Sequence, residues 1–527
     1  MLRVVTAAVC LSAILVTSLS AFLVLDANSF WFDELYTAWI IDTDATSFSE
    51  LIAALAVDTN PPGYFLVAWA AMTAFGGDEV IVLRAMSACA AAMALVLVYL
   101  APPEGTSRTA RLIGAAVAAT SGVWMHFALD ARSYALCLLC AAAMALAAIR
   151  VMAAYEGRAR APVWLGLLTA ASVAGAFLNY YVILAAGGLC AGLLLFAPDW
   201  QMRIAVVLTG LAILLPVLML VAWQSEYRGH DFSATHFKST LAGMTFEFVR
   251  GLRFLVGSKA GGLALAVLAL FIAAAAPRAW ARGGDGRWRI RATLVLVSGA
   301  GLSVVFGVLA SLVYLPLFQA RVLVISAPFI GVAIGLLADL ALRDERAVLA
   351  KGMMLSAAFL TALLATKVLW RDLPYNDPYR EGAAIMARRS ACADSPAIAA
   401  MRRNSGFARF TYMFYLNRMS PERTLLFVDQ ADRDLRRLDP ATEAALARRA
   451  SGEDACPVLL WGVRSPTLAA GEFRDALAGR YFGGDVERID IVRLLPPGPT
   501  RLQRFIGASA RSDNGFALLL RGATPGE

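Results

Sequence analysis

Long uninterrupted runs of apolar residues dominate the first 370 positions of the chain. A helix needs about 20 mainly apolar residues to cross the hydrocarbon core of a membrane. By this criterion the sequence predicts about eleven membrane-spanning helices, and therefore an α-helical polytopic membrane protein. Their approximate ranges are 4–25, 80–101, 112–128, 134–150, 162–178, 181–197, 204–222, 261–277, 292–314, 322–341 and 352–369.

Two apolar stretches need separate interpretation. The first run shares a basic start and nearby small residues with signal peptides. It exceeds twenty residues and many spans follow, so we interpret it as an uncleaved helix. The stretch from Pro61 to Phe75 is only fifteen residues long and opens with Pro-Pro-Gly. This suits a juxtamembrane helix lying at the membrane interface better than a crossing helix.

The orientation follows from the basic residues in the short loops. If all eleven spans cross, alternate loops on one face collect most of the arginines, and the positive-inside rule makes this face cytoplasmic. The N-terminus is then inside, and the loop 26–79 and the C-terminal tail are outside. The residues that decide this orientation are Arg108, Arg111, Arg150, Arg158, Arg160, Arg203, Arg278, Arg282, Arg287, Arg289, Arg291, Arg343, Arg346 and Lys351.

Charge divides the chain into two regions. Of the 47 basic and 39 acidic residues, 42 lie in 371–527. We therefore expect a transmembrane module at 1–370, which includes the outside loop 26–79, and a small extracytoplasmic domain at 371–527. The runs 423–429, 456–463 and 486–495 are typical of strands, and 441–450 and 472–481 of helices, which favours an α/β domain.

Composition excludes several classes of protein. With 59% hydrophobic and 16% charged residues, the chain is no soluble enzyme, disordered chain or disulfide scaffold. The net charge of +8 fits arginine-rich cytoplasmic loops, and no aromatic–basic motif indicates a nucleic-acid partner. Because an extracytoplasmic compartment is oxidising, we predict that Cys392 and Cys456 form a disulfide. No Cys-x-x-Cys or His-Glu-x-x-His metal pattern occurs.

The first candidate site residues follow the first span. Asp33 and Glu34 come directly after the aromatic cluster Phe30–Phe32. Interfacial aromatic residues anchor at the headgroup level, so the two carboxylates are expected near the membrane surface. A carboxylate there is suited to taking a proton from a hydroxyl nucleophile. The alternative is a pair of solvated loop acids.

Further ionisable residues lie at the outer ends of other spans. Asp130 and Arg132 lie in a short loop after His126, where they either neutralise each other or leave Arg132 to meet a lipid phosphate. Arg84 and Arg321 each open an apolar run and either snorkel or capture a phosphate. The three histidines of the chain all fall in predicted outside loops, where we expect surface roles rather than metal binding.

Together these motifs form an ordered series. An outside Asp-Glu is followed by Pro61-Pro62-Gly63-Tyr64, by Leu83-Arg84, by Asp130-Ala131-Arg132 with Tyr134, and by Gln319-Ala320-Arg321. The series resembles the GT-C superfamily of polytopic membrane glycosyltransferases. The branch it resembles most is the protein O-mannosyltransferase and aminoarabinose-transferase type. The resemblance covers roughly residues 1–340, and the tail shares with the family only its expected location outside.

The resemblance implies transfer of a sugar, with inversion, from a polyprenyl-phosphate donor to a lipid, glycan or protein acceptor outside the cytoplasmic membrane. It makes Asp33 the general base, with Glu34 in support and Asp130 as the acid of the second loop. Arg132 and Arg321 would lie near the donor phosphate.

The resemblance also makes further residues candidates for substrate binding. The sequence departs from the family pattern at two positions. The further candidates are Arg84, Tyr64, Asn60, His126 and Tyr134. Asn60 stands where many members have His, and Asp130 replaces a more usual Glu. Some members use a divalent metal ion and others do not, so the cofactor question stays open at this point.

Two other classes predict different features. A transporter or lipid flippase is expected to carry ionisable residues deep within its spans, or internally repeated halves with broken helices. A membrane-anchored assembly protein has no need of clustered outside acids. Here the charges lie at span ends and no repeat is evident, which favours the glycosyltransferase.

Overall fold

The computed structural model describes the chain except at 24, 27–28, 43–46, 158, 229–239, 257–258, 314–317, 345, 366–376, 390–391, 402–405, 422, 430–431, 433, 464–466, 495–514 and 521–527. The described residues form two compact units, and we treat each by itself. The first comprises those of Met1–Leu25 and Asp44–Arg371, and the second those of Asp26–Thr43, Asp372–Thr500 and Ser509–Glu527. The start of the expected outside loop thus clusters with the C-terminal unit.

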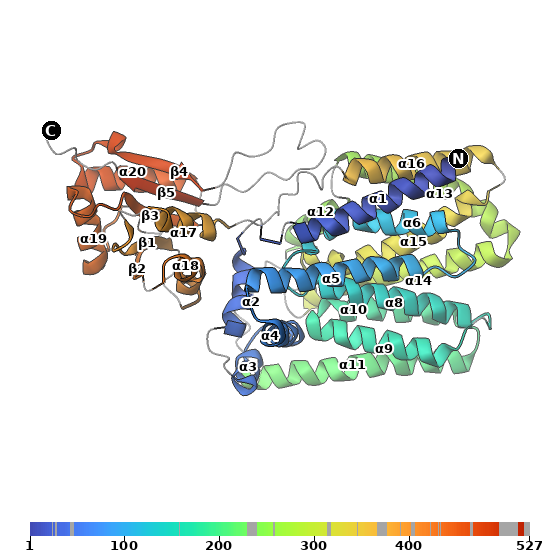
Figure 1. The fold of residues 1–527 in the computed structure, drawn as a ribbon. Coiled ribbons are helices and arrows are strands. Elements are labelled where there is room, and N and C mark those ends of the chain that lie inside the picture. The colour runs from blue at the N-terminus through green and yellow to red at the C-terminus, as the bar shows by residue number, and fades with distance from the viewer. Residues whose placement is uncertain are drawn as a thin grey trace. The chain divides into compact units, whose positions relative to one another are not determined.

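The first unit is entirely helical in its described part, and its long helices run alongside one another (Figure 1). Its elements are α1 (Leu2–Leu23), α3 (Phe48–Ala56), α4 (Gly63–Phe75), α5 (Glu79–Leu100), α6 (Arg108–Ala119), α7 (Gly122–Phe127), α8 (Tyr134–Ala154), α9 (Ala161–Leu178), α10 (Tyr181–Phe196), α11 (Trp200–Arg228), α12 (Leu241–Val256), α13 (Lys259–Arg282), α14 (Gly284–Val313), the 3-10 helix η1 (Ala320–Ile325), α15 (Ser326–Leu342) and α16 (Ala347–Ala365).

Nine helices in the described part of the chain are long and apolar enough to cross a membrane, and they coincide with nine of the eleven predicted spans. The chain is therefore a multi-pass membrane protein. The predicted span 112–128 is divided into α6 and α7, because the Ser121 Oγ accepts from the Trp124 amide at 3.2 Å and starts a new helix. Helix α10 has 16 residues, about 24 Å at 1.5 Å per residue, which is shorter than the hydrocarbon core. Helix α4 is also short, with 13 residues.

Small residues let the helices of the first unit pack closely. A Cβ added to Gly114 of α6 would lie 2.4 Å from the carbonyl oxygen of Gly331 of α15. No side chain fits into that space, so the two backbones are in direct contact. Close approach through glycine is typical of helix pairs in membranes. This contact fixes α15, and with it η1, which leads directly into α15.

Hydrogen bonds define one end of this helical unit. The Arg84 guanidinium in α5 donates to the carbonyl of Leu25, just beyond α1, at 2.9 Å. One turn later, the Ser87 Oγ donates to the carbonyl of Asp130, just before α8, at 2.7 Å. The end of α1, the start of α5 and the start of α8 therefore meet. This end carries most of the candidate residues in the first unit.

The opposite end holds a buried ionic network. Arg289 of α14 is about 1% exposed and pairs with Asp339 of α15 at 3.2 Å and with Asp285 at 3.0 Å. It also donates to the Thr106 hydroxyl at 2.8 Å, and Arg343 pairs with Asp339 at 2.7 Å. A buried charge is tolerated where such partners compensate for its lost hydration. Several arginines of the predicted cytoplasmic loops are thus structural.

The second unit is an α/β domain built around one five-stranded sheet (Figure 1). The sheet order is β2-β1-β3-β5-β4, with the β1 pairings parallel and the β5 pairings antiparallel. Its elements are α2 (Phe32–Asp42), α17 (Tyr379–Ala387), β1 (Ala397–Met401), α18 (Gly406–Met419), β2 (Leu425–Asp429), α19 (Pro440–Ser451), β3 (Val458–Val463), α20 (Thr467–Tyr481), η4 (Val486–Arg488), β4 (Ile489–Arg493) and β5 (Gly515–Leu520).

The sequence predicts part of this domain. The three predicted strands correspond to β2, β3 and β4, and the two predicted helices to α19 and α20. The strands β1 and β5 and the helices α17 and α18 are additional. In register, Ala399 of β1 lies opposite Phe427 of β2 and Trp461 of β3. Helices α19 and α20 pack on the sheet, and Phe473 of α20 and Phe516 of β5 are buried in the core.

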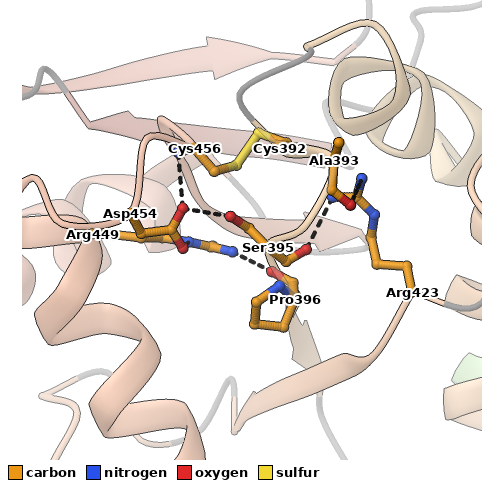
Figure 2. The surroundings of a disulfide bond; sticks show 8 residues. All are labelled: Cys392, Ala393, Ser395, Pro396, Arg423, Arg449, Asp454 and Cys456. Carbon is orange, nitrogen blue, oxygen red and sulfur yellow. Dashed lines mark hydrogen bonds and ion pairs between the residues drawn. A yellow bond between two sulfur atoms is a disulfide. The ribbon is translucent and has the colours of Figure 1, made fainter.

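The predicted disulfide is confirmed. Cys392 and Cys456 are bonded, with their Cα atoms 4.4 Å apart. Both lie in a small apolar cluster with Met386 of α17 and Leu416 of α18. The bond ties the segment before β1 to the segment before β3 (Figure 2). It therefore holds the segments that enter the two central parallel strands.

Candidate functional site

The two predicted catalytic carboxylates lie in the first turn of α2. Asp33 is half-buried, whereas Glu34 is only 1% exposed. The Glu34 Oε2 accepts from the Trp31 amide at 3.1 Å, the contact that an acid in the first turn makes with the residue before a helix. One carboxylate oxygen of Glu34 is thus occupied by a hydrogen bond that caps the helix. Negative charge in this turn also interacts favourably with the helix dipole.

The segment that carries Asp33 is fixed onto the rest of the second unit. The Phe32 amide donates to the Asp377 Oδ2 at 3.0 Å, and the Phe30 amide donates to the Tyr415 hydroxyl at 2.6 Å. The Phe32 ring packs edge-on against Phe407 of α18, with centroids 4.8 Å apart. These contacts span more than 340 positions in the sequence.

This packing corrects one sequence-based expectation. We expect Phe30–Phe32 to anchor at the headgroup level, but Phe30 and Trp31 are 0% and 5% exposed within the second unit. The Phe30 ring lies 5.8 Å from that of Phe414. Protein packing, rather than contact with lipid, accounts for the burial of these two residues. Asp33 is therefore held by a folded domain.

Arg321 and Tyr134 form the best-defined polar contact at the candidate end of the first unit. The Arg321 Nη1 donates to the Tyr134 hydroxyl at 2.8 Å, and its guanidinium lies 5.7 Å from the centre of the same ring. The Phe127 ring packs against Tyr134 at 4.7 Å. A guanidinium has five N–H donors, so the bond to Tyr134 does not exhaust its capacity to bind anions.

Asp130 and Arg132 lie in the neighbouring loop. Asp130 is 5% exposed, and its backbone is held by Ser87. The Arg132 guanidinium lies 5.9 Å from the centre of the Phe65 ring of α4, within reach of a cation–π interaction. The short helix α4 thus contributes directly to the surroundings of Arg132. His126, half-buried in the last turn of α7, lies a few residues before this loop.

Arg84 does not snorkel. Arg84 is only 1% exposed, and its guanidinium donates to the Leu25 carbonyl. A snorkelling side chain keeps its charged head in water, so burial removes that alternative for Arg84. Arg321, in contrast, is half-buried.

Asn60 and Tyr64 flank the start of α4. The side-chain amide of Asn60 donates to Asp58 at 2.9 Å, and the backbone carbonyl of Asn60 accepts from Gln224 of α11 at 2.9 Å. The Tyr180 hydroxyl in turn donates to Gln224. Tyr64 is 2% exposed, and its ring packs against that of Phe65. The predicted juxtamembrane segment is thereby bonded to α11.

One residue of this end is absent from the sequence-based candidates. Glu247 lies in α12, within a stretch that we expect to be an outside loop. Its Oε2 accepts from the Ala320 amide at 2.9 Å, directly before Arg321, and its Oε1 pairs with Arg250 at 3.5 Å. Helix α12 packs against η1 and α7. The sequence gives no local sign of this role because Ala320 is 73 positions away.

The described part of the chain contains no group of three His, Cys, Asp or Glu side chains that could hold a metal ion. His230 and His236 lie outside the described residues. Within the first unit, Arg321 and Arg132 provide cations and Tyr134 provides a hydroxyl, which are groups suited to an anion. Within the second unit, it provides a carboxylate at a helix start.

Comparisons with known proteins identify the fold. No protein-family model and no curated protein matches the chain. Among solved structures, it is similar to the crystal structure of ArnT from Cupriavidus metallidurans in the apo state, with 14% identity, a TM-score of 0.51 and 97% of each chain covered.

Two further structures are similar at lower scores. The structure of the same ArnT bound to undecaprenyl phosphate has 14% identity, a TM-score of 0.49 and 98% of each chain covered. The archaeal oligosaccharyltransferase AglB from Archaeoglobus fulgidus, in complex with an inhibitory peptide and a dolichol-phosphate, has 11% identity and a TM-score of 0.46. That likeness covers 91% of this chain and 71% of the other.

At this level of identity the likeness concerns the fold alone. The chain shares the fold of ArnT, with a multi-pass helical unit and a small C-terminal α/β unit. This is the GT-C-like arrangement that the sequence predicts. The predicted fold class is confirmed.

Proposed function

We propose that this chain is an inverting glycosyltransferase that moves a sugar from a polyprenyl-phosphate-linked donor to an acceptor on the extracytoplasmic side of the membrane. The observation that carries the proposal is the bond between Arg321 and Tyr134, at the end of the helical unit where Arg132 and Asp130 also lie. The GT-C-like fold supports the same class of enzyme, because ArnT has this fold over its whole length.

In the proposed reaction, an acceptor oxygen attacks the anomeric carbon of the sugar. The new carbon–oxygen bond forms as the bond from that carbon to the phosphate oxygen breaks, and the lipid phosphate leaves with the electron pair. Because a phosphate is already a good leaving group, no covalent enzyme intermediate is needed. One displacement inverts the anomeric centre.

Each candidate residue has a role in this reaction. Asp33 takes the proton of the acceptor hydroxyl, a contribution of about 10²–10⁴-fold for general base catalysis. Arg321, Arg132 and Arg84 stabilise the phosphate as negative charge develops on it, and Tyr134 orients Arg321. Glu34 supports α2.

The remaining candidates concern substrate position. We assign Asp130 to the loop that carries Arg132. Tyr64, Asn60 and His126 would contact the acceptor or the sugar, because they lie in or directly before α4 and α7, beside the arginines.

The proposed orientation rests on charge and on the disulfide. The end of the helical unit opposite to the candidate residues carries Arg289, Arg343 and the other basic loops, and the positive-inside rule assigns such an end to the cytoplasm. The bonded cysteines of the second unit suit an oxidising compartment. Both arguments support a cytoplasmic-membrane protein whose C-terminal domain lies outside.

A transporter or flippase remains the alternative from another class. Within the nine candidate spans, every Asp, Glu, Lys and Arg lies within eight residues of a helix end. Transport sites of charged substrates usually lie near the middle of the membrane and use broken helices. The distribution of charge therefore favours an enzyme at one membrane face.

The direct test is to incubate the purified full-length protein with a panel of radiolabelled polyprenyl-phosphate sugars and candidate acceptors. A transferase releases lipid phosphate and makes the acceptor radioactive, whereas a flippase moves intact donor across a vesicle membrane. The Arg321→Gln variant should release less lipid phosphate at limiting donor than the matched variant Arg291→Gln at the opposite end. Movement of intact donor without release would refute the proposal.

A further inference from the structure

The C-terminal unit contains a groove that the proposed transfer reaction does not use. Its volume is about 790 Å³, within the range of small-ligand sites. It lies between the end of α17, the segment before β1, the start of β2 and α19. The charged residues that line it are Arg389, Asp394, Arg423 and Arg448.

One wall of the groove is firmly built (Figure 2). The disulfide holds Cys456 against the segment 392–396. The Asp454 carboxylate accepts from the Cys456 amide at 2.9 Å, from the Ser395 hydroxyl and from Arg449 at 3.1 Å. Burial alone would raise the pKa of Asp454, but these hydrogen bonds together lower it below its ordinary value. The wall is therefore fixed by an ionised carboxylate and a covalent bond.

Arg423 fixes the same wall from the side of β2. It donates to the carbonyl of Ser395 at 3.0 Å and to that of Ala393 at 3.1 Å (Figure 2). Because Arg423 is half-buried and held at two points, its charge has a defined position. A preorganised charge binds an anion with less loss of side-chain entropy than a mobile one.

Two further arginines line the groove. The side chains of Arg389 and Arg448 are exposed, and neither makes a hydrogen bond or ion pair with a residue that the structure describes. Asp394 is the one acid among the lining residues, so the groove is cationic. Hydroxyl groups of Ser395, Ser420 and Thr424 belong to the same lining. The groove thus combines guanidinium groups with neutral hydrogen-bonding groups.

We propose that this groove binds an anionic oligosaccharide, with Arg389, Arg423 and Arg448 contacting its acidic groups and the hydroxyls contacting its sugar rings. Guanidinium groups pair with carboxylate or phosphate oxygens in two-point geometry. That the ligand is a saccharide rests on the proposed function, in which a glycan of the cell envelope is one possible acceptor. That the ligand is anionic rests on the arginines alone.

The test measures binding to the full-length protein in phosphatidylcholine nanodiscs by calorimetry. The probes are tetragalacturonate, neutral maltotetraose and inorganic tripolyphosphate. We expect tetragalacturonate to bind, with affinity that falls as sodium chloride rises from 50 to 500 mM, because salt screens exposed charges. Maltotetraose should bind at least tenfold more weakly.

A pair of double variants assigns the binding to the groove. Arg389→Gln with Arg448→Gln should weaken tetragalacturonate binding about tenfold, because the pair of substitutions removes two exposed ion pairs with the ligand. Arg388→Gln with Arg436→Gln removes the same charge from the same unit outside the groove and should leave binding within twofold. Equal losses in both double variants would show that only net charge matters and would overturn the assignment.

Other outcomes also decide the proposal. Equal affinity for maltotetraose would refute the role of charge, and tripolyphosphate binding as tight as tetragalacturonate would refute a saccharide site. If tetragalacturonate does not bind at all, both the role of charge and the saccharide assignment are wrong. Tetragalacturonate binding that persists when no donor is turned over would support the groove while the transferase proposal fails, so the two failures are distinguishable.

Discussion

Replacing Glu247 with Ala should weaken donor binding without touching a proposed catalytic group. Glu247 lies in α12 and accepts from the Ala320 amide, the first residue of η1. Amides at the start of a helix have no partner within the helix. Glu247 supplies that partner, and the next residue, Arg321, bonds Tyr134. The substitution therefore loosens the backbone that positions Arg321.

The magnitude follows from this one bond. A hydrogen bond to a charged group contributes about 1.5–3 kcal/mol. The Glu247 side chain is 23% exposed, so water replaces part of the lost bond and the lower end of the range applies. A loss of about 1.4 kcal/mol is a tenfold change in an equilibrium constant. We therefore expect Glu247→Ala to raise the KM for the donor about tenfold, with kcat changed less than twofold.

The assay combines donor titrations of transfer with direct binding of polyprenyl phosphate to the purified protein. Glu247→Gln keeps a side-chain oxygen that can accept from Ala320, so it should stay within about threefold of the unmodified protein. Glu104→Ala removes an exposed acid at the opposite end of the helical unit and serves as the matched control. The positioning argument is wrong if Glu247→Ala lowers kcat alone, or if Glu247→Gln is as defective as Glu247→Ala.

Three further predictions concern stability. Gly114→Leu should disrupt folding, because even a Cβ at this position meets backbone at 2.4 Å. Gly301→Leu should be tolerated, because a Cβ there meets nothing within 4 Å. Equal thermal stability of the two variants would contradict the close helix contact. Cys392→Ser should destabilise the second unit by about 4 kcal/mol, the chain-entropy value for cysteines separated by 64 positions, and denaturant unfolding with and without reductant measures it. Because the pKa of Asp454 is lowered in the folded state, its stabilisation is fully present above the ordinary value near 3.8 and is lost as the pH falls through the lower folded value. Asp454→Asn should therefore reduce the fall in the free energy of unfolding as the pH is lowered into the acid range. The same fall in the variant and the unmodified protein would refute this prediction.

The membrane helices could be predicted because lipid leaves a simple signal. Long apolar runs identify α1, α5 and α8 without knowledge of their neighbours. The break between α6 and α7 is harder to predict, since Ser121 is a small side chain within an apolar run and only its bond to the Trp124 amide shows that it starts a helix. Local hydropathy does not contain that information.

The second unit shows a different limit. The strand β1 reads Ala-Ile-Ala-Ala-Met, a composition that favours helix by intrinsic propensity. It is a strand because β2 and β3 pair with it on both sides. Tertiary pairing overrides local preference here, and no pattern in the segment itself indicates it.

The candidate residues stand out in the sequence, but the contacts that hold them in place do not. The motifs around Asp33 and Arg321 are visible in the sequence because they contain charge beside apolar runs. Asp377 lies 345 positions from its partner Phe32, and Glu247 lies 73 positions from its partner Ala320. Only the folded chain shows that Asp377 accepts from the start of α2 and that Glu247 accepts from the residue before Arg321.

The central claim is that Asp33 is the base of a sugar transfer from a lipid phosphate. The most direct measurement is single-turnover release of polyprenyl phosphate by Asp33→Asn, beside Asp199→Asn, in which Asn can still cap α11 at the opposite end. We predict that Asp33→Asn binds the donor normally and transfers at least about 100-fold more slowly, while Asp199→Asn transfers at the unmodified rate. An Asp33→Asn protein that transfers sugar as fast as the unmodified one would contradict the account.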